Sequence, residues 1–468
     1  MDWAAPRLGA GRYPTAKHTM SLEQFGYEDQ LDRALSLVDL IVYGMIFMVP
    51  IAPFSVFGFV WQDAHGMVVL AYLIGMAGML FTAMSYAAMS SAFPLAGSVY
   101  AYVQRGLHET AGFLAGWLIL LDYILIPALL YLFSAVALRP LLPQIPVSAW
   151  LVGFVAVNAA ANLLGVRFTA HLYKVLLVLE LLTLAVFVVL GARALYNGAG
   201  AGGLTPAPFY DPRHFSLTTV AGATSIAVLS FLGFDGISTL SEESAGARHA
   251  IARATLLSLV LIGVLFVLQT WIAADLAQGM RFQSAATAFY QVAARAGGNG
   301  LRLAAILAVV ISFGIANAMA AQAAVARVLF AMARDRKLPA VLAAVHPRFK
   351  TPYVSTLLVA AVSLLVGLFF ARRIDDLSRV VNFGALTSFA LLHVAVAYHH
   401  FFRRRSGAWV RHLLCPLAGL IVILYVLAGM DRTAKILGGC WIALGIVYYI
   451  VLSLLGRSRT DVASIPPE

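Results

Sequence analysis

The chain has 468 residues, of which 61% are hydrophobic and 11% are charged, and it carries a formal net charge of +11 at pH 7. Soluble domains are about 45–50% apolar and about 25% charged, so this composition excludes a soluble globular protein and indicates an integral membrane protein. The positive charge does not indicate a nucleic-acid partner, because the basic residues are scattered between apolar runs and form no stripe interleaved with aromatic side chains.

Apolar runs of about 20 residues, the length of a membrane-spanning helix, recur along the whole chain. They predict an all-α polytopic membrane protein with twelve transmembrane helices, whose approximate cores are 36–60, 68–92, 112–138, 147–166, 171–192, 217–240, 254–277, 303–327, 353–371, 380–402, 412–430 and 436–456. The stretch 282–296 is short and amphipathic, and we expect it to lie on the surface rather than to cross the membrane.

These runs divide the chain into an N-terminal tail, two groups of five helices joined by a Gly- and Pro-rich loop, a final helix pair and a C-terminal tail. The corresponding ranges are 1–35, 36–192, 193–216, 217–402, 403–456 and 457–468. Lys and Arg concentrate in cytoplasmic loops of membrane proteins. The loop "ARDRKLP" at 333–339 and the run Arg403–Arg405 dominate this bias, so we expect a cell-membrane protein with both termini in the cytoplasm.

Two of the predicted helices contain residues that break a helix. The first carries Pro50 and Pro53 within "FMVPIAPFSVFG", and the sixth carries Gly233 and Gly236 on either side of Asp235 within "SFLGFDGISTLSEES". Proline removes a backbone donor and clashes with the preceding turn. Breaks five helices apart are expected of two inverted five-helix repeats, and such broken helices form substrate sites near the bilayer midplane.

Several longer motifs carry a resemblance to a known family. They are "FPLAGSVYAYVQRGL" at 93–107, "GWLILLDYILIP" at 116–127, the sixth-helix motif, "RVLFAMARDRKLP" at 327–339, "HPRFKTP" at 346–352 and "NFGAL" at 382–386. Over residues 35–455 the chain resembles the amino acid–polyamine–organocation permeases, and within them the putrescine importers. The resemblance implies a LeuT-like 5+5 inverted repeat with helices 1 and 6 broken. It also implies secondary active uptake of a small amine or amino acid, usually coupled to protons.

The resemblance also implies residue roles. The importers' sixth-helix motif corresponds to Asp235, Glu242 and Glu243, and further matches fall on Tyr100, Tyr102, Asp122 and Tyr123. Two positions depart from the pattern. Ser55 stands where those importers carry an aspartate after the first-helix break, which weakens the case for putrescine itself. Glu180 stands where many family members carry a lysine that replaces a sodium ion.

The candidate substrate-binding residues are therefore Ala52, Ser55, Tyr100, Asp122, Tyr123, Phe231, Gly233, Asp235 and Glu242, and the candidate coupling or gating residues are Asp39, Lys174 and Glu180. Carboxylates within the membrane are costly and tend to face a cavity or a partner. Each also has a structural interpretation: Asp235 could cap exposed amides, Asp122 could bond to a neighbouring helix, and Asp39 could be a gate or the partner of an arginine. Phe231 and Tyr123 could be gates or packing residues.

An interior rich in carboxylates favours a cationic ligand, so we expect a transporter of a small organic amine of the polyamine or monoamine type. The alternative is a neutral amino acid permease, whose substrate carboxylate would lie on the half-helix after Pro53. Around Ser312 there is no adjacent pair of hydroxyls to hold sodium, which favours coupling to protons. An enzyme is not expected, because the chain lacks HExxH, a histidine box and Gly-x-Ser-x-Gly, and neither a metal nor a cofactor is predicted. A channel is disfavoured because no pore motif repeats, and oligomeric state is not encoded in these patterns.

Overall fold

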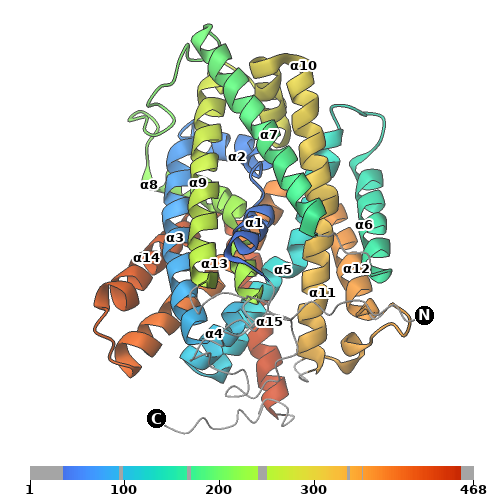
Figure 1. The fold of residues 1–468 in the computed structure, drawn as a ribbon, viewed down its shortest axis with the longest axis vertical. Helices are drawn as coiled ribbons and strands as arrows, with labels where there is room; N and C mark the ends of the chain where they lie inside the picture. Colours follow the sequence, from blue (N-terminus) through green and yellow to red (C-terminus); the bar gives the residue numbers. More distant parts are fainter. Residues whose placement is uncertain are drawn as a thin grey trace, which may run out of the picture.

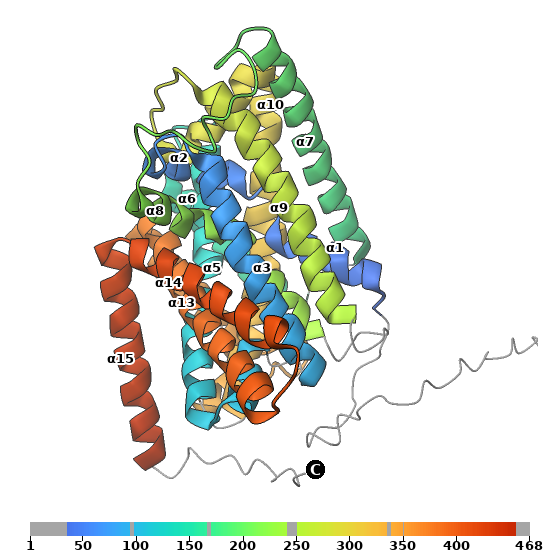
Figure 2. The same cartoon turned by 90° about the vertical axis from the view of Figure 1, so that its left-hand side faces the viewer.

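The computed structural model describes residues 35–93, 98–165, 170–240, 250–334, 338–349 and 351–454. All of the elements within these ranges are helical, as the apolar runs predict, and most of the long helices run along the length of the molecule (Figure 1). Figure 2 shows α14 (Cys415–Gly429) and α15 (Arg432–Leu454) on the outside of the bundle. We call the end of the molecule where the chain enters the first helix the α1 end, and the opposite end the α2 end.

The helices that precede the sixth-helix break are α1 (Leu37–Met48), α2 (Pro53–Asp63), α3 (Val68–Ala92), α4 (Ser98–Gly106), α5 (Glu109–Leu138), α6 (Val147–Leu163), α7 (Ala170–Tyr196), α8 (Leu217–Ala227) and the 3-10 helix η2 (Val228–Phe231). After the break follow η3 (Phe234–Leu240), α9 (Ala250–Ala277), η4 (Ala285–Thr287), α10 (Ala288–Ile311), η5 (Ser312–Asn317), α11 (Ala318–Arg334), η6 (Ala340–Ala343), α12 (Tyr353–Phe370), α13 (Ile374–Val396), η7 (Ala397–Arg403) and η8 (Val410–Leu414), which leads into α14 and α15. The elements η5, η7 and η8 are π-helical.

The described residues form ten helices long and apolar enough to cross a membrane, and an eleventh if the bent pair α1 and α2 is one span. The remaining predicted span corresponds to α6, which is apolar but has only 17 residues. The chain is therefore a multi-pass membrane protein, and the predicted count of twelve depends on whether this shorter helix crosses the bilayer.

The first helix is interrupted at its prolines. α1 ends at Met48, Val49 takes a positive φ of 53°, and α2 begins at Pro53 with its axis turned by 53°. Proline is favoured at the first helical position because the amide it lacks would have no partner there. The carbonyl of Pro50 is not left unpaired, since the Gln269 side chain donates to it at 2.9 Å. Unpaired backbone groups are costly in lipid, and this contact removes that cost.

The sixth helix is interrupted earlier than the Gly233–Gly236 segment suggests. α8 gives way to η2 after Ala227, Leu232 is extended, and Gly233 has a φ of +109° before η3 begins. A Cβ atom at Gly233 would lie 2.8 Å from the Phe47 carbonyl oxygen, so only glycine fits there. The two interruptions therefore lie against each other inside the bundle.

The segment 282–296 lies partly at the surface, with Gln283, Ser284 and Arg295 exposed, but its apolar face is buried. Phe289 is 1% exposed, and its ring stacks on Phe54 of α2 with centroids 3.9 Å apart. The helix changes direction at Gly297 and Gly298, which have non-helical backbone angles, and only then runs along the bundle. The apolar face of this segment thus packs on the half-helix after the first break instead of on lipid.

Candidate functional site

Asp235 lies at the sixth-helix break, where η3 begins. The Tyr123 hydroxyl on α5 donates a hydrogen bond of 2.8 Å to its Oδ2 atom. The carboxylate also lies beside the backbone amides of Gly233 and Gly236. Asp235 is only 3% exposed, so it both caps the unwound segment and connects it to α5.

A second buried carboxylate, Asp122, precedes Tyr123 on α5. It is 5% exposed, and its Oδ1 atom has no hydrogen-bond partner. Asp122 and Asp235 lie within electrostatic range of each other, and among the described residues neither carboxylate forms an ion pair with Lys or Arg. Uncompensated buried charge is strongly unfavourable. The pair therefore requires a proton or a cation that the described residues do not supply.

Aromatic rings enclose the same region. The Tyr86 ring contacts Phe234, Tyr102 and Phe389 with centroid distances of 5.6, 5.8 and 5.8 Å, and all four side chains are at most 1% exposed. Tyr86 lies within electrostatic range of both Asp235 and Asp122. Aromatic faces attract cations, and do so more strongly away from water. Two carboxylates beside this cluster suit an organic ammonium group.

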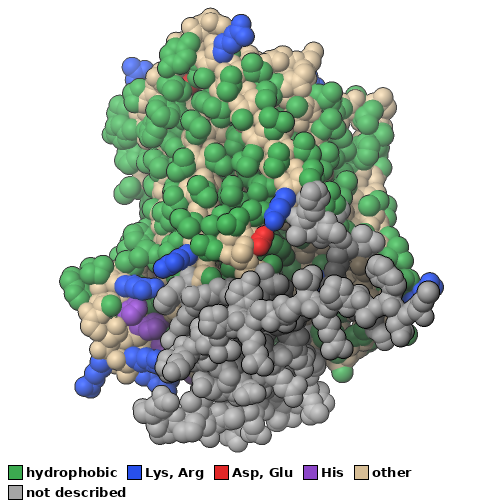
Figure 3. Space-filling model, viewed as in Figure 1, with side chains coloured by type: hydrophobic (Ala, Val, Ile, Leu, Met, Phe, Trp, Pro, Cys, Tyr) green, Lys and Arg blue, Asp and Glu red, His purple; other side chains and the backbone are tan. Residues whose placement is uncertain are grey.

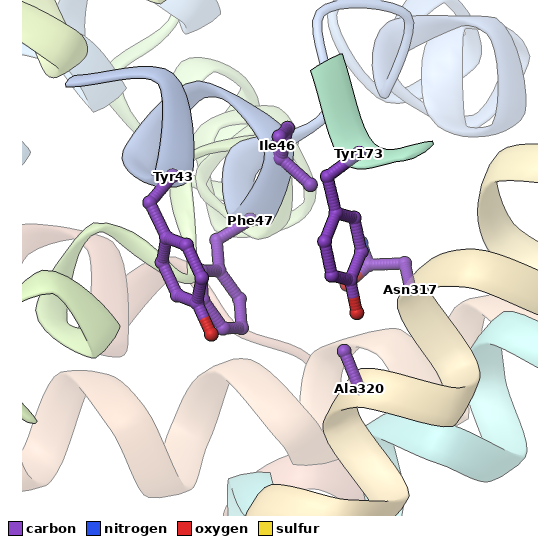
Figure 4. A pocket seen from close by; sticks show the side chains of 6 residues that line it. All are labelled: Tyr43, Ile46, Phe47, Tyr173, Asn317 and Ala320. Atoms are coloured by element: carbon purple, nitrogen blue, oxygen red, sulfur yellow. The ribbon is translucent and has the colours of Figure 1, made fainter. Parts of the chain in front are cut away.

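Phe47 separates this region from a small cavity toward the α1 end. The cavity has a volume of about 10 Å³ and lies between α1, α7, η5 and α11 (Figure 4). Its lining side chains are Tyr43, Ile46, Phe47, Tyr173, Asn317 and Ala320. A Cβ atom added at Gly236 would lie 3.8 Å from the Phe47 ring, so the ring also borders the sixth-helix break. This position makes Phe47 a candidate gate, although no sequence motif identified it.

Ion pairs connect both halves of the first helix to the rest of the bundle. On α1, the Asp39 carboxylate accepts a hydrogen bond of 2.9 Å from the Lys174 Nζ atom of α7. Asp39 and Ser36 also form a capping box at the start of α1. On α2, Asp63 pairs with Arg379 of α13.

A model of the amino acid permease family matches residues 36–454. The chain is an amino acid permease of the amino acid–polyamine–organocation superfamily. It is similar to the low-affinity putrescine importer PlaP of Escherichia coli K12, with 31% identity over 90% of this chain and 93% of that protein. It is also similar to two proteins of Bacillus subtilis, each at 25% identity: the branched-chain amino acid permease BcaP, over 91% of this chain and 94% of the relative, and a methylthioribose transporter, over 90% and 94%. The permease is therefore a transporter and not an enzyme.

The structure brings some of the permease's predicted site residues together. Asp122, Tyr123, Gly233 and Asp235 converge where α5 meets the sixth-helix break. Ala52 and Ser55 are buried at the start of α2, and the Ser55 hydroxyl lies beside Tyr290 of α10. Glu242 lies outside the described residues.

Two predicted substrate contacts lie elsewhere. The Phe231 ring packs on Phe266 of α9 and Tyr72 of α3, with centroids 5.0 and 6.1 Å apart. Tyr100 lies on α4 against Gly116 of α5, nearly two helical turns before Asp122. Aromatic residues in an apolar helix have the same sequence pattern whether they pack or bind, so the substrate contacts of Phe231 and Tyr100 stay predictions.

The predicted coupling residues lie on the α1 side. Glu180 of α7 is 6% exposed and lies beside the Ser312 hydroxyl of η5. Asp39 was expected to be a gate or the partner of an arginine, but its ion-pair partner is Lys174, itself a predicted gating residue. The Asp63–Arg379 pair was not predicted, because its members lie 316 positions apart in the chain and no motif contains both.

Proposed function

We propose that this permease imports a small organic amine by alternating access, with proton coupling. The observation that carries the proposal is the buried pair Asp122 and Asp235, which lacks a Lys or Arg partner among the described residues. Two unit charges 4 Å apart attract by about 4 kcal/mol at an effective dielectric of 20, before desolvation is subtracted. An ammonium group, polyamine or monoamine, would supply the missing charge. The similarity to the putrescine importer of Escherichia coli supports the same substrate class.

The two carboxylates would have different roles in binding the ammonium group. Asp235 is partly satisfied by Tyr123 and by backbone amides, whereas the Oδ1 atom of Asp122 has no partner. The ammonium would therefore bridge the two, with Asp235 orienting it and Asp122 providing the free acceptor. Ser55 supplies a hydroxyl instead of a carboxylate on α2, so a second ammonium would gain less there. This favours substrates shorter or less charged than a diamine.

A radiolabelled uptake panel of amines and amino acids in proteoliposomes tests the proposal directly. We expect saturable uptake of an amine, and Asp235→Asn and Asp122→Asn should each lower kcat/KM by about 30-fold or more, because each leaves a buried cation with one anion fewer. Tyr123→Phe is the matched control, since it removes one hydrogen bond without changing charge and should cost about ten-fold or less. Ser55→Asp should shift preference toward diamines. Normal amine uptake by Asp235→Asn would refute the cation proposal.

For coupling, we propose Glu180 as a proton acceptor. It is a buried acid with an unpartnered Oε2 atom, and no hydroxyl residue adjoins Ser312 in the sequence "VVISFGIAN" to form the hydroxyl pair that a sodium site would use. An imposed proton gradient should drive amine accumulation by the wild type and should fail to do so in Glu180→Gln, while counterflow exchange persists. Sodium-driven uptake at constant pH would contradict this assignment.

A neutral amino acid permease is the second candidate, favoured by the similarity to the branched-chain amino acid permease. Its substrate carboxylate would need the free amides at the start of α2. There, the amides of Phe54 and Ser55 already donate to the carbonyls of Ile51 and Ala52 at 2.9 and 3.2 Å. Asp235 lies among the sixth-helix amides and would repel a carboxylate. Uptake of zwitterions only, with no amine transported, would establish this alternative.

For topology we propose that the α1 end faces the cytoplasm, together with both termini. The basic run Arg403–Arg405 lies at that end, between α13 and α14, and Lys and Arg favour the cytoplasmic side. Reporter fusions at each terminus would test this, and an active periplasmic reporter at either one would refute it.

A further inference from the structure

The hairpin that joins α13 to α14 carries an unusual concentration of cationic side chains. It runs from η7 (Ala397–Arg403) through a turn to η8 (Val410–Leu414), and Arg405 in the turn has a positive φ of 48°. Figure 3 shows blue and purple side chains gathered beside green ones at the lower left of the molecule, where α13 and α14 meet.

Four arginines of this hairpin are exposed, namely Arg403, Arg404, Arg405 and Arg411. Among the described residues none of the four forms an ion pair with a carboxylate, in contrast to Arg379 and Lys174 elsewhere in the molecule. Four guanidinium groups so close together repel one another unless an anion neutralises them. The hairpin therefore presents a positive surface that no carboxylate among the described residues neutralises.

Three histidines belong to the same hairpin as the arginines. His400 and His412 stack with ring centroids 4.4 Å apart, and the His400 and His399 rings are 4.9 Å apart. His399 is 4% exposed, yet neither of its ring nitrogens has a hydrogen-bond partner. Buried polar atoms normally find a partner. An acceptor oxygen from a bound group would fill this role.

The rim of the hairpin is apolar and aromatic. The exposed fractions of Trp409, Phe402 and Tyr398 are 55%, 62% and 46%. Trp and Tyr are enriched at the interface between membrane and water. An apolar strip continues from the hairpin along α14, where Leu417 and Ile421 are 41% and 66% exposed. A ligand that lies here has its charged part at the arginines and its apolar part along α14.

We propose that the hairpin 397–414 binds the headgroup of an acidic glycerophospholipid, with the acyl chains along α14. Basic pockets between transmembrane helices on the cytoplasmic side suit anionic headgroups. Free phosphate would neutralise the arginines but would make no contact with the aromatic rim or with the apolar strip along α14. A lipid satisfies both features, so it is the occupant that the surface fits.

Trp409 provides a direct readout of lipid at this surface. We would reconstitute the full chain in phosphatidylcholine and titrate bromine-labelled phosphatidylglycerol or bromine-labelled phosphatidylcholine. Trp409→Phe isolates the contribution of this tryptophan to the fluorescence. We expect bromine-labelled phosphatidylglycerol to quench Trp409 at a mole fraction about ten-fold lower than bromine-labelled phosphatidylcholine. The reason is that each arginine near an anionic headgroup adds to the binding free energy of that lipid. The preference should weaken as salt is raised.

The arginine variants test the assignment to the hairpin. The quadruple variant Arg403→Gln, Arg404→Gln, Arg405→Gln and Arg411→Gln should lose the preference. The matched control replaces four exposed arginines elsewhere, Arg193→Gln, Arg213→Gln, Arg281→Gln and Arg372→Gln, removes the same total charge and should keep it. Equal quenching by the two lipids in the wild type would overturn the proposal. This comparison uses only the wild-type protein, so it does not depend on whether a variant folds. Retained preference in the quadruple variant, or a preference abolished by inorganic phosphate at constant ionic strength, would overturn it too.

Discussion

The two halves of the broken first helix are held by ion pairs of different character. At the α1 end, Asp39 and Lys174 pair across side chains that are 35% and 50% exposed. At the α2 end, Asp63 pairs with Arg379, whose side chain is 11% exposed and also reaches Asp431 at 4.0 Å. The Asp63 and Asp431 side chains are 32% and 30% exposed. Exposed pairs contribute about 0–1 kcal/mol and removal of one partner from a buried pair costs about 3–5 kcal/mol, so this half-buried pair lies between the two limits. The α2 end is therefore closed by the stronger contact and the α1 end by the weaker one.

The surroundings of the two pairs strengthen this contrast. Beside Arg379 on α13, Asn382 donates to the Ser225 carbonyl of α8 at 2.6 Å, so α2, α8 and α13 are joined in one polar network. At the α1 end, the hydrogen bonds of the Asp39–Lys174 pair among the described residues are those with Ser36 at the start of the same helix. A carrier stabilised in this way would open first at the α1 end.

Arg379→Gln should have the largest effect, because it leaves Asp63 and Asp431 unpaired near α13. We expect a destabilisation of about 2–3 kcal/mol, because the two carboxylates that lose their partner are about one-third exposed. We also expect increased labelling, by an aqueous thiol reagent, of a cysteine introduced at Ser225. The measurements are thermal unfolding of the purified protein and labelling rate in membranes.

Asn382→Leu is the companion variant for this prediction. It breaks the neighbouring hydrogen bond to α8 but keeps the ion pair, and it should increase labelling less. A labelling rate in Arg379→Gln equal to that of the parent cysteine protein would show that the pair does not hold the α2 end closed.

Sequence patterns could predict features that are local or that belong to a motif. They could not predict contacts between segments that are distant in the sequence. Apolar runs predicted the long helices. Pro53 lies where the first helix resumes, and Gly233 has a positive φ within the sixth-helix interruption, but that interruption begins earlier, after Ala227. The closeness of Asp122 to Asp235 was expected only through the family resemblance. Arg379 carried no signal, since an arginine in a polar-flanked helix start does not reveal a partner in α2. The amphipathic pattern at 282–296 suits a membrane surface and a groove between helices equally well.

Gly233→Ala should have an intermediate effect, because Gly233 lies where the sixth-helix break contacts the first helix. The backbone φ of +109° disfavours any L side chain, and the added Cβ would collide with the Phe47 carbonyl. We expect a loss of about 1–3 kcal/mol of stability and a large fall in uptake rate, measured by unfolding and by initial-rate transport. Gly279→Ala is a suitable control, since its φ of +74° imposes a similar backbone strain without any neighbour within 4 Å. Equal uptake rates in the two variants would show that contact between the breaks is unimportant for transport.

Lys174→Gln should have the smallest effect on stability and a distinct effect on transport. The exposed pair with Asp39 contributes less than about 1 kcal/mol, so thermal unfolding should hardly change. The α1 end would nevertheless open more often, and a cysteine introduced at Ala320 beside the cavity should be labelled faster from that side. Asp39→Asn should give the same increase, and the double variant should give no more than either single one, because both remove a single interaction. Additive increases in the double variant, or a stability loss as large as that of Arg379→Gln, would contradict the difference between the two ends.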